Sequence, residues 1–180
     1  METQATFHIG DKIEYPLHGM GRVHALCIRV IDAQPQCYYQ IVLEGETKGE
    51  VLVPVASAQT LGLRHVLQAS QVLQVLRRVQ QAATQPVTQR QALKHYAWCK
   101  MRLRQGDAFG LAEVWRFLHA LMEVETITSP QLKQVRAYVG KQLSAEIASA
   151  LHCGNDVAQH LLITALTSEH PVVLPSPADG

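Results

Sequence analysis

The chain has 180 residues, of which 47% are hydrophobic and 17% charged, and its formal net charge is +1. This composition excludes a globally disordered chain, and the length allows one large domain or two small ones. No apolar stretch is long enough to cross a membrane, and the four cysteines form no CxxC pair that would indicate a zinc site. Because no signal peptide is evident, we expect a cytoplasmic protein with free thiols and with neither a metal nor a cofactor.

The first third of the chain consists of short strand-like segments separated by turn residues. Gly10 and Asp11 favour a turn, and Pro16 ends the next strand because proline has no N–H to donate. Five short strands predict a small Tudor- or SH3-like β-barrel in residues 1–62. The expected strands are residues 6–9, 12–15, 21–30, 37–43 and 50–55, with a loop at 32–36.

Beyond residue 66 the apolar residues change to the helical period of about 3.6. Ser129 and Pro130 place an N-cap before a proline at the first helical position. Residues 63–168 should therefore form an all-α domain, and the proline-containing tail 169–180 should be disordered. The predicted fold class is α+β, with the small β-barrel followed by this C-terminal helical domain. The expected helices are residues 66–80, 88–105, 107–124, 130–153 and 155–167, with a linker at 80–88.

Charge is unevenly distributed along the chain. No acidic residue occurs between Glu50 and Asp107, and this window holds eight basic residues. The predicted helix at 88–105 therefore carries positive charge with no carboxylate to neutralise it. Phosphate contacts need only such charge and no base reading, whereas a solvated basic face is the alternative interpretation. The eight basic residues are Arg64, Arg77, Arg78, Arg90, Lys94, Lys100, Arg102 and Arg104.

Residues 7–23 resemble the start of the RNA-polymerase-interacting domain of the CarD/CdnL family of bacterial transcription regulators. The resemblance continues through residues 53–66 and 106–118 to 146–148, so that it covers most of residues 5–165. The matching positions of the opening segment are Phe7, Gly10, Asp11, Tyr15, Pro16, His18, Gly19, Gly21 and Val23.

This resemblance implies that the barrel docks on the β subunit of bacterial RNA polymerase, with Arg29 and Tyr39 as contact residues. It also implies that the helical domain contacts promoter DNA beside the transcription bubble, with little sequence preference, and changes open-complex stability. A cytoplasmic, nucleoid-associated protein that is a monomer is then expected. The candidate DNA-binding residues are Arg90, Lys94, His95, Trp98, Lys100 and Arg102.

Two positions depart from the family pattern. Leu52 stands where the family has a second basic residue, just before the strand-ending proline. Ala92 stands where well-known members have a tryptophan that wedges into the minor groove, and an alanine cannot fill a base step in this way. Trp98 lies six residues later, on another part of the helix, which favours a packing role unless the helix is shifted. These departures motivate an alternative, a polymerase-binding adaptor whose helical domain binds a protein instead of DNA.

Catalysis is the least favoured class of function. The nine histidines include no pair at His-x-x-x-His spacing that would place two ligands on one helical face. No nucleophile elbow and no phosphate-cradling glycine loop is present either. We therefore expect a binding protein and not an enzyme.

Overall fold

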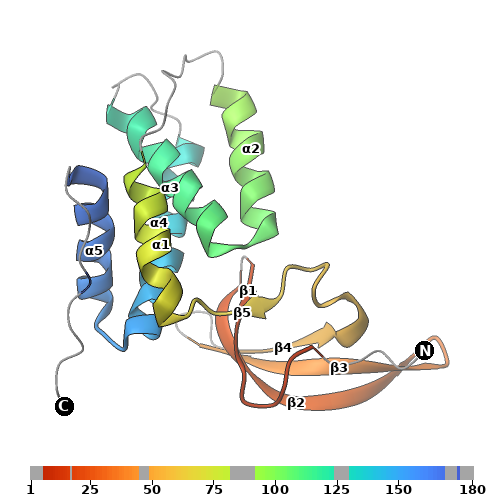
Figure 1. The fold of residues 1–180 in the computed structure, drawn as a ribbon. Coiled ribbons are helices and arrows are strands. Elements are labelled where there is room, and N and C mark those ends of the chain that lie inside the picture. Colours follow the sequence, from red (N-terminus) through yellow and green to blue (C-terminus); the bar gives the residue numbers. More distant parts are fainter. Residues whose placement is uncertain are drawn as a thin grey trace. The chain divides into compact units, whose positions relative to one another are not determined.

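A computed structural model describes residues 6–16, 18–44, 49–81, 92–123, 130–168 and 174. The chain divides into two compact units (Figure 1). The sheet unit comprises Met1–Val66 with Arg104–Gly106, and the helical unit comprises Leu67–Leu103 with Asp107–Gly180. Among the described residues, none of the helices is both long and apolar enough to span a bilayer.

The sheet unit contains one antiparallel sheet with the strand order β4-β3-β2-β1-β5. The α+β class is thus confirmed, and the sheet is open, so the five strands do not close into the predicted Tudor- or SH3-like barrel. After β4 ends at Pro54, a short 3-10 helix at Val55–Ser57 turns the chain, and β5 has two residues that pair with β1 alone. The strands are β1 Lys12–Tyr15, β2 Gly19–Ile31, β3 Gln34–Leu43, β4 Gly49–Pro54 and β5 Arg64–His65.

The segment before β1 is a turn, so the strand predicted at residues 6–9 does not form. The Asp11 carboxylate accepts the His8 backbone N–H at 2.8 Å, and the Asp11 N–H donates to the His8 carbonyl at 3.1 Å. The Gly10 N–H donates to the Val23 carbonyl at 2.8 Å, and Gly10 has φ of 95°. Local capping by an aspartate and a glycine with positive φ therefore replaces strand pairing here.

The long strands β2 and β3 form a hairpin with a tight turn at Asp32 and Ala33, whose φ angles are 50° and 60°. Ile31 pairs directly with Gln34, so β3 begins inside the segment that the sequence predicted to be a loop (Figure 1). A two-residue turn with both φ values positive matches the twist of the flanking strands. Alanine rarely adopts this conformation, which is why the turn was not predicted.

The core of the sheet unit lies on one face of the sheet. Ile13, Val23, Tyr39, Ile41 and Val53 are almost completely buried there. From Tyr39 to Leu43 of β3 the buried residues alternate with more exposed ones, as expected for a sheet with one packed face.

The helical unit is built around α1 Ala69–Gln80, whose residues contact those of α3, α4 and α5. α1 begins three residues after the predicted start, where the Gln71 side chain accepts the Gln68 N–H at 3.1 Å. Val72, Leu76 and Val79 are fully buried, so the apolar spacing read from the sequence forms the core face. The other helices are α2 Ala92–Gln105, α3 Ala108–Glu123, α4 Pro130–Leu151 and α5 Asn155–Thr167.

Two contacts of α4 show how closely the helical unit packs. The Glu146 carboxylate of α4 is fully buried and accepts the Leu67 backbone N–H at 3.2 Å, which attaches the segment before α1. A Cβ atom at Gly140 of α4 would lie 2.3 Å from the Trp115 ring of α3. Glycine at 140 therefore permits the tryptophan to lie against the α4 backbone.

Candidate functional site

Arg29 is exposed on the face of the sheet opposite the core. It lies on β2 directly across from Gln36 of β3, whose side chain accepts the Tyr38 hydroxyl at 3.0 Å. Among the described residues, no carboxylate forms an ion pair with Arg29. A partner can therefore reach the guanidinium group without breaking an existing charge pair.

Leu52 lies on this same face, because it pairs with Gln40 of β3, the neighbour in sequence of the core residue Tyr39. Its side chain is 44% exposed, and the adjacent Gln40 amide donates to the Glu50 carboxylate at 2.9 Å. The position expected to carry a second basic residue is thus solvent-facing but aliphatic in this chain. Arg29 is left without the second positive charge that the resemblance implies.

The opposite face of the hairpin carries an aliphatic strip, which we define as Leu26, Ile28 and Val30 of β2. These side chains are 42%, 71% and 72% exposed, although Leu26 pairs with the core residue Tyr39 and continues the core face. At Ile28 and Val30 neither edge of the hairpin is paired among the described residues, because β4 pairs with β3 only from Tyr38 to Leu43 and β1 pairs with β2 only as far as Arg22. Exposed apolar strips on a two-stranded ribbon are typical of interaction surfaces.

Tyr39 is a core residue, and its predicted role as a contact residue does not fit its position. The side chain is fully buried and packs edge-to-face on Phe7, with ring centroids 5.6 Å apart. Its hydroxyl accepts the backbone N–H groups of Thr6 and Phe7 at 2.8 Å and 3.1 Å. The hydroxyl therefore holds the segment before β1 on the sheet and is not available to a partner. The alternation of Tyr39 with Ile41 was the sequence signal for this inward orientation.

The structure describes the side chains of only some of the candidate DNA-binding residues on and before α2. Arg90 lies outside the described residues, and the side chains of Lys94 and His95 are not described. The Lys100 side chain is exposed, with Nζ 5.3 Å from the centroid of the Tyr96 ring. This arrangement leaves the ammonium group of Lys100 at the surface, where it can reach a phosphate.

Arg102 is ion-paired, so the prediction that no carboxylate neutralises this helix is wrong for that residue. Its guanidinium contacts the carboxylate of Glu113 on α3. The other oxygen of Glu113 lies 3.7 Å from Nε of Arg78 on α1. Glu113 is outside the acid-free stretch of sequence, and the packing of α3 brings it to the basic residues.

Trp98 belongs to the packing of the helical unit. It is half-buried against the helical core, and its ring meets Phe117 of α3 edge-to-face at 5.3 Å. A tryptophan held in this way is not positioned as a wedge between base pairs. The packing interpretation of Trp98 therefore agrees with the structure.

Residues 7–67 match the family model of the CarD-like/TRCF RID domain. This segment is a CarD-like RNA-polymerase-interacting domain, or RID. The RID includes all five strands and ends before α1 begins at Ala69, so the match does not extend to the helices. A comparison with curated protein sequences gives no significant match. The RID gives the chain a transcription-related role in which it interacts with RNA polymerase.

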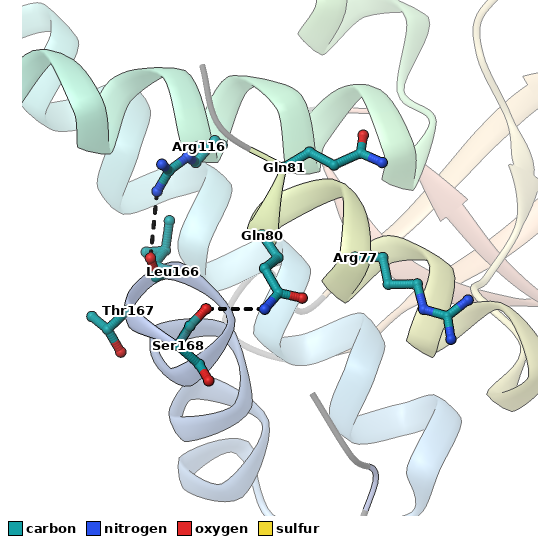
Figure 2. Close-up of a pocket in the computed structure, with 7 residues that line it drawn as sticks. All are labelled: Arg77, Gln80, Gln81, Arg116, Leu166, Thr167 and Ser168. Atoms are coloured by element: carbon teal, nitrogen blue, oxygen red, sulfur yellow. Dashed lines mark hydrogen bonds between the residues drawn. The ribbon is translucent and has the colours of Figure 1, made fainter. Parts of the chain in front are cut away.

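Outside the RID, a pocket of about 590 Å³ lies between the C-terminal ends of α1 and α5 (Figure 2). The Gln80 amide donates to the Ser168 carbonyl at 3.0 Å, and Arg116 donates to the Leu166 carbonyl at 3.5 Å. The Arg77 side chain points away from these groups (Figure 2). The donors thus satisfy the last carbonyls of α5, as capping side chains do, and do not converge on a ligand.

The cysteine thiol of α2 and the grouping of possible metal ligands bear on catalysis and metal binding. Burial raises the pKa of the Cys99 thiol on α2 to about 12, so this cysteine is held as an unreactive thiol. Within the described part of the chain, no three His, Cys, Asp or Glu side chains lie together as a metal site would require.

Proposed function

We propose that this chain is a transcription regulator that binds the β subunit of bacterial RNA polymerase through the Arg29 face of the RID. The RID match supports a polymerase partner, and the exposed guanidinium of Arg29, with no ion pair among the described residues, supports the contact. Arginine is enriched in interface hot spots because its planar guanidinium makes several directed hydrogen bonds. We further propose that the protein is a cytoplasmic, nucleoid-associated monomer without enzymatic activity.

Capture of the polymerase β subunit by the full-length protein tests this contact. Arg29→Glu reverses the charge at the centre of the proposed surface, and we expect the affinity to fall by about tenfold or more. Lys133→Glu makes the same change of charge at an exposed position on α4 and should leave capture unchanged. Equal affinity of the two variants for the β subunit would show that Arg29 is not a contact.

The second part of the proposal is that the helical unit binds promoter DNA through phosphate contacts and modulates open-complex stability. The exposed ammonium of Lys100 and the two arginines that share the single carboxylate of Glu113 support a positive surface. Such contacts position a protein on a duplex with little sequence preference, and they weaken steeply with added salt.

A footprint of the full-length protein on a polymerase–promoter complex tests the DNA contact. We expect protection at the upstream edge of the bubble, and we expect it to disappear when Lys94 and Arg102 are both changed to Glu. Open-complex lifetime should change together with the footprint. Protection that persists in the double variant would assign the footprint to the RID and the polymerase alone.

The alternative function is a polymerase-binding adaptor whose helical unit recruits a protein. The packed position of Trp98, together with Ala92 at the wedge position, favours this alternative, because neither residue supplies a DNA wedge. An adaptor would still capture the β subunit through Arg29. It would not bind duplex DNA even at low salt, and that measurement separates the two functions.

A further inference from the structure

Three charged side chains from three different helices meet in the helical unit. Glu113 of α3 contacts the guanidinium of Arg102 on α2 through one carboxylate oxygen. Its other oxygen lies 3.7 Å from Nε of Arg78 on α1. We call these three residues the Glu113 cluster. Residues 78 and 102 are far apart in the sequence, and no local motif connects them.

The Glu113 cluster keeps a net positive charge, because one carboxylate faces two guanidinium groups. The side chain of Arg78 is 47% exposed, whereas those of Arg102 and Glu113 are 31% and 27% exposed. The 3.7 Å contact of Arg78 through Nε is longer than a hydrogen bond, and its terminal nitrogens make no hydrogen bond among the described residues. These terminal nitrogens therefore remain available to a ligand at the surface.

The charge of the two helices that carry Arg78 and Arg102 also favours an anion. Arg77 on α1 and Lys100 on α2 are also exposed and add positive charge to these two helices, although their spacing of one and two residues turns them away from the directions of Arg78 and Arg102. Neither α1 nor α2 contains an acidic residue. Partly exposed ion pairs contribute little net stability, so packing alone gives little reason for two arginines around one carboxylate.

We propose that Arg78 and Arg102 form a phosphate-binding pair for the backbone of duplex DNA, and that α1 therefore takes part in the DNA contact together with α2. The inference rests on the proposed DNA-binding function and adds a contact residue that the sequence did not indicate. Guanidinium groups bind phosphate through paired hydrogen bonds. The Glu113 carboxylate contacts both guanidinium groups and competes with a phosphate for them, so it limits the strength of binding.

Equilibrium binding of the full-length protein to a mixed-sequence duplex, measured between 50 and 200 mM salt, tests this pair. Arg78→Gln and Arg102→Gln should each weaken binding and reduce the slope of log affinity against log salt by about 1. The loss should be about threefold larger at 50 mM than at 200 mM salt, since one phosphate contact contributes about 0.9 to that slope. Glu113→Gln keeps a hydrogen-bonding oxygen but removes the negative charge, so it should tighten binding.

Lys133→Gln provides a matched control, because it removes one positive charge from an exposed position on α4. It should leave the salt slope unchanged. Arg78→Lys keeps the charge and should retain the slope, which keeps the test valid if Arg78→Gln does not fold. Thermal unfolding of each variant shows whether it is folded.

The outcomes separate this inference from the function on which it rests. If the unmodified protein binds DNA but Arg78→Gln matches Lys133→Gln in affinity and slope, α1 is not part of the contact and the inference fails alone. Weaker binding by Glu113→Gln would also overturn it, because the carboxylate would then be a positioning group and not a competitor of the phosphate. If the unmodified protein does not bind duplex DNA at low salt, the DNA-binding function and the inference both fail.

Discussion

The RID and the helical unit present their candidate binding groups in opposite ways. In the RID, Arg29 and the aliphatic strip extend from a long hairpin into solvent, and the described residues leave them without ion pairs or cover. In the helical unit, Arg102 contacts a carboxylate from another helix and Trp98 packs on a neighbouring ring. Within a strand, neighbouring residues point to opposite faces, so core and contact residues are separated locally. In the helical unit, a charged side chain of one helix forms ion pairs with side chains of other helices.

This contrast predicts that a core substitution in the RID lowers its free energy of unfolding without changing its affinity for the polymerase β subunit. Tyr39→Phe removes the acceptor of two backbone N–H groups, and leaving such groups without partners costs about 1–3 kcal/mol of unfolding free energy. Capture of the polymerase β subunit under native conditions should not change, because the hydroxyl faces the core. Chemical denaturation and capture measured on the same variant check both statements. If the folded Tyr39→Phe variant captured less of the β subunit, Tyr39 would be a contact residue after all.

In the helical unit we expect the cost of overpacking to exceed the gain in helix propensity when a glycine at a helix contact is replaced. Gly140→Ala gains up to about 1 kcal/mol of helix propensity, but its Cβ would meet the Trp115 ring, and overpacking typically costs about 1–3 kcal/mol. A net loss of about 1 kcal/mol in the free energy of unfolding is therefore expected. Denaturation curves give this value, and the double variant with Trp115→Leu should show a smaller penalty for alanine. Net stabilisation by Gly140→Ala alone would mean that Trp115 moves aside freely.

The cysteines of the two units also differ in exposure and therefore in expected reactivity. Cys37 is exposed on the hairpin of the RID, whereas Cys99 is buried in α2 and its pKa is raised to about 12. Because the folded-state pKa lies above the ordinary value of 9.0, Cys99 contributes stability that is complete below pH 9 and is lost as the pH rises toward 12.

The stability advantage of the unmodified protein over Cys99→Ala should therefore shrink by up to about 1.4 kcal/mol per pH unit above pH 9. Denaturation of both proteins from pH 8 to pH 10.5 measures this difference, in which the titration of other groups cancels. A difference that does not vary with pH would show that the thiol ionises as readily in the folded state as in the unfolded state. Thiol labelling should modify Cys37 in the native protein and Cys99 only after unfolding.

Much of the RID was predictable because its signals are local. The opening segment with Gly10, Asp11 and Pro16 placed the first turn and the end of β1, and the resemblance to the polymerase-interacting domain began with it. The turn at Asp32 and Ala33 was missed because alanine does not favour positive φ. The open sheet was missed because strand count and spacing do not reveal whether the two edge strands meet.

The sequence by itself determined the α+β class and the helical segments of the described residues, and its resemblance to the polymerase-interacting domain identified that domain. The helices follow from the spacing of apolar residues along the chain. Arg29, in contrast, reaches the face opposite the core because the register of β2 shifts between Val23 and Ala25. Only the tertiary structure decided that Tyr39 holds the segment before β1, that the aliphatic strip is exposed, and that Glu113 joins arginines from two other helices. These features depend on which elements pack together, and an ion pair between helices leaves no periodic signal in either of them.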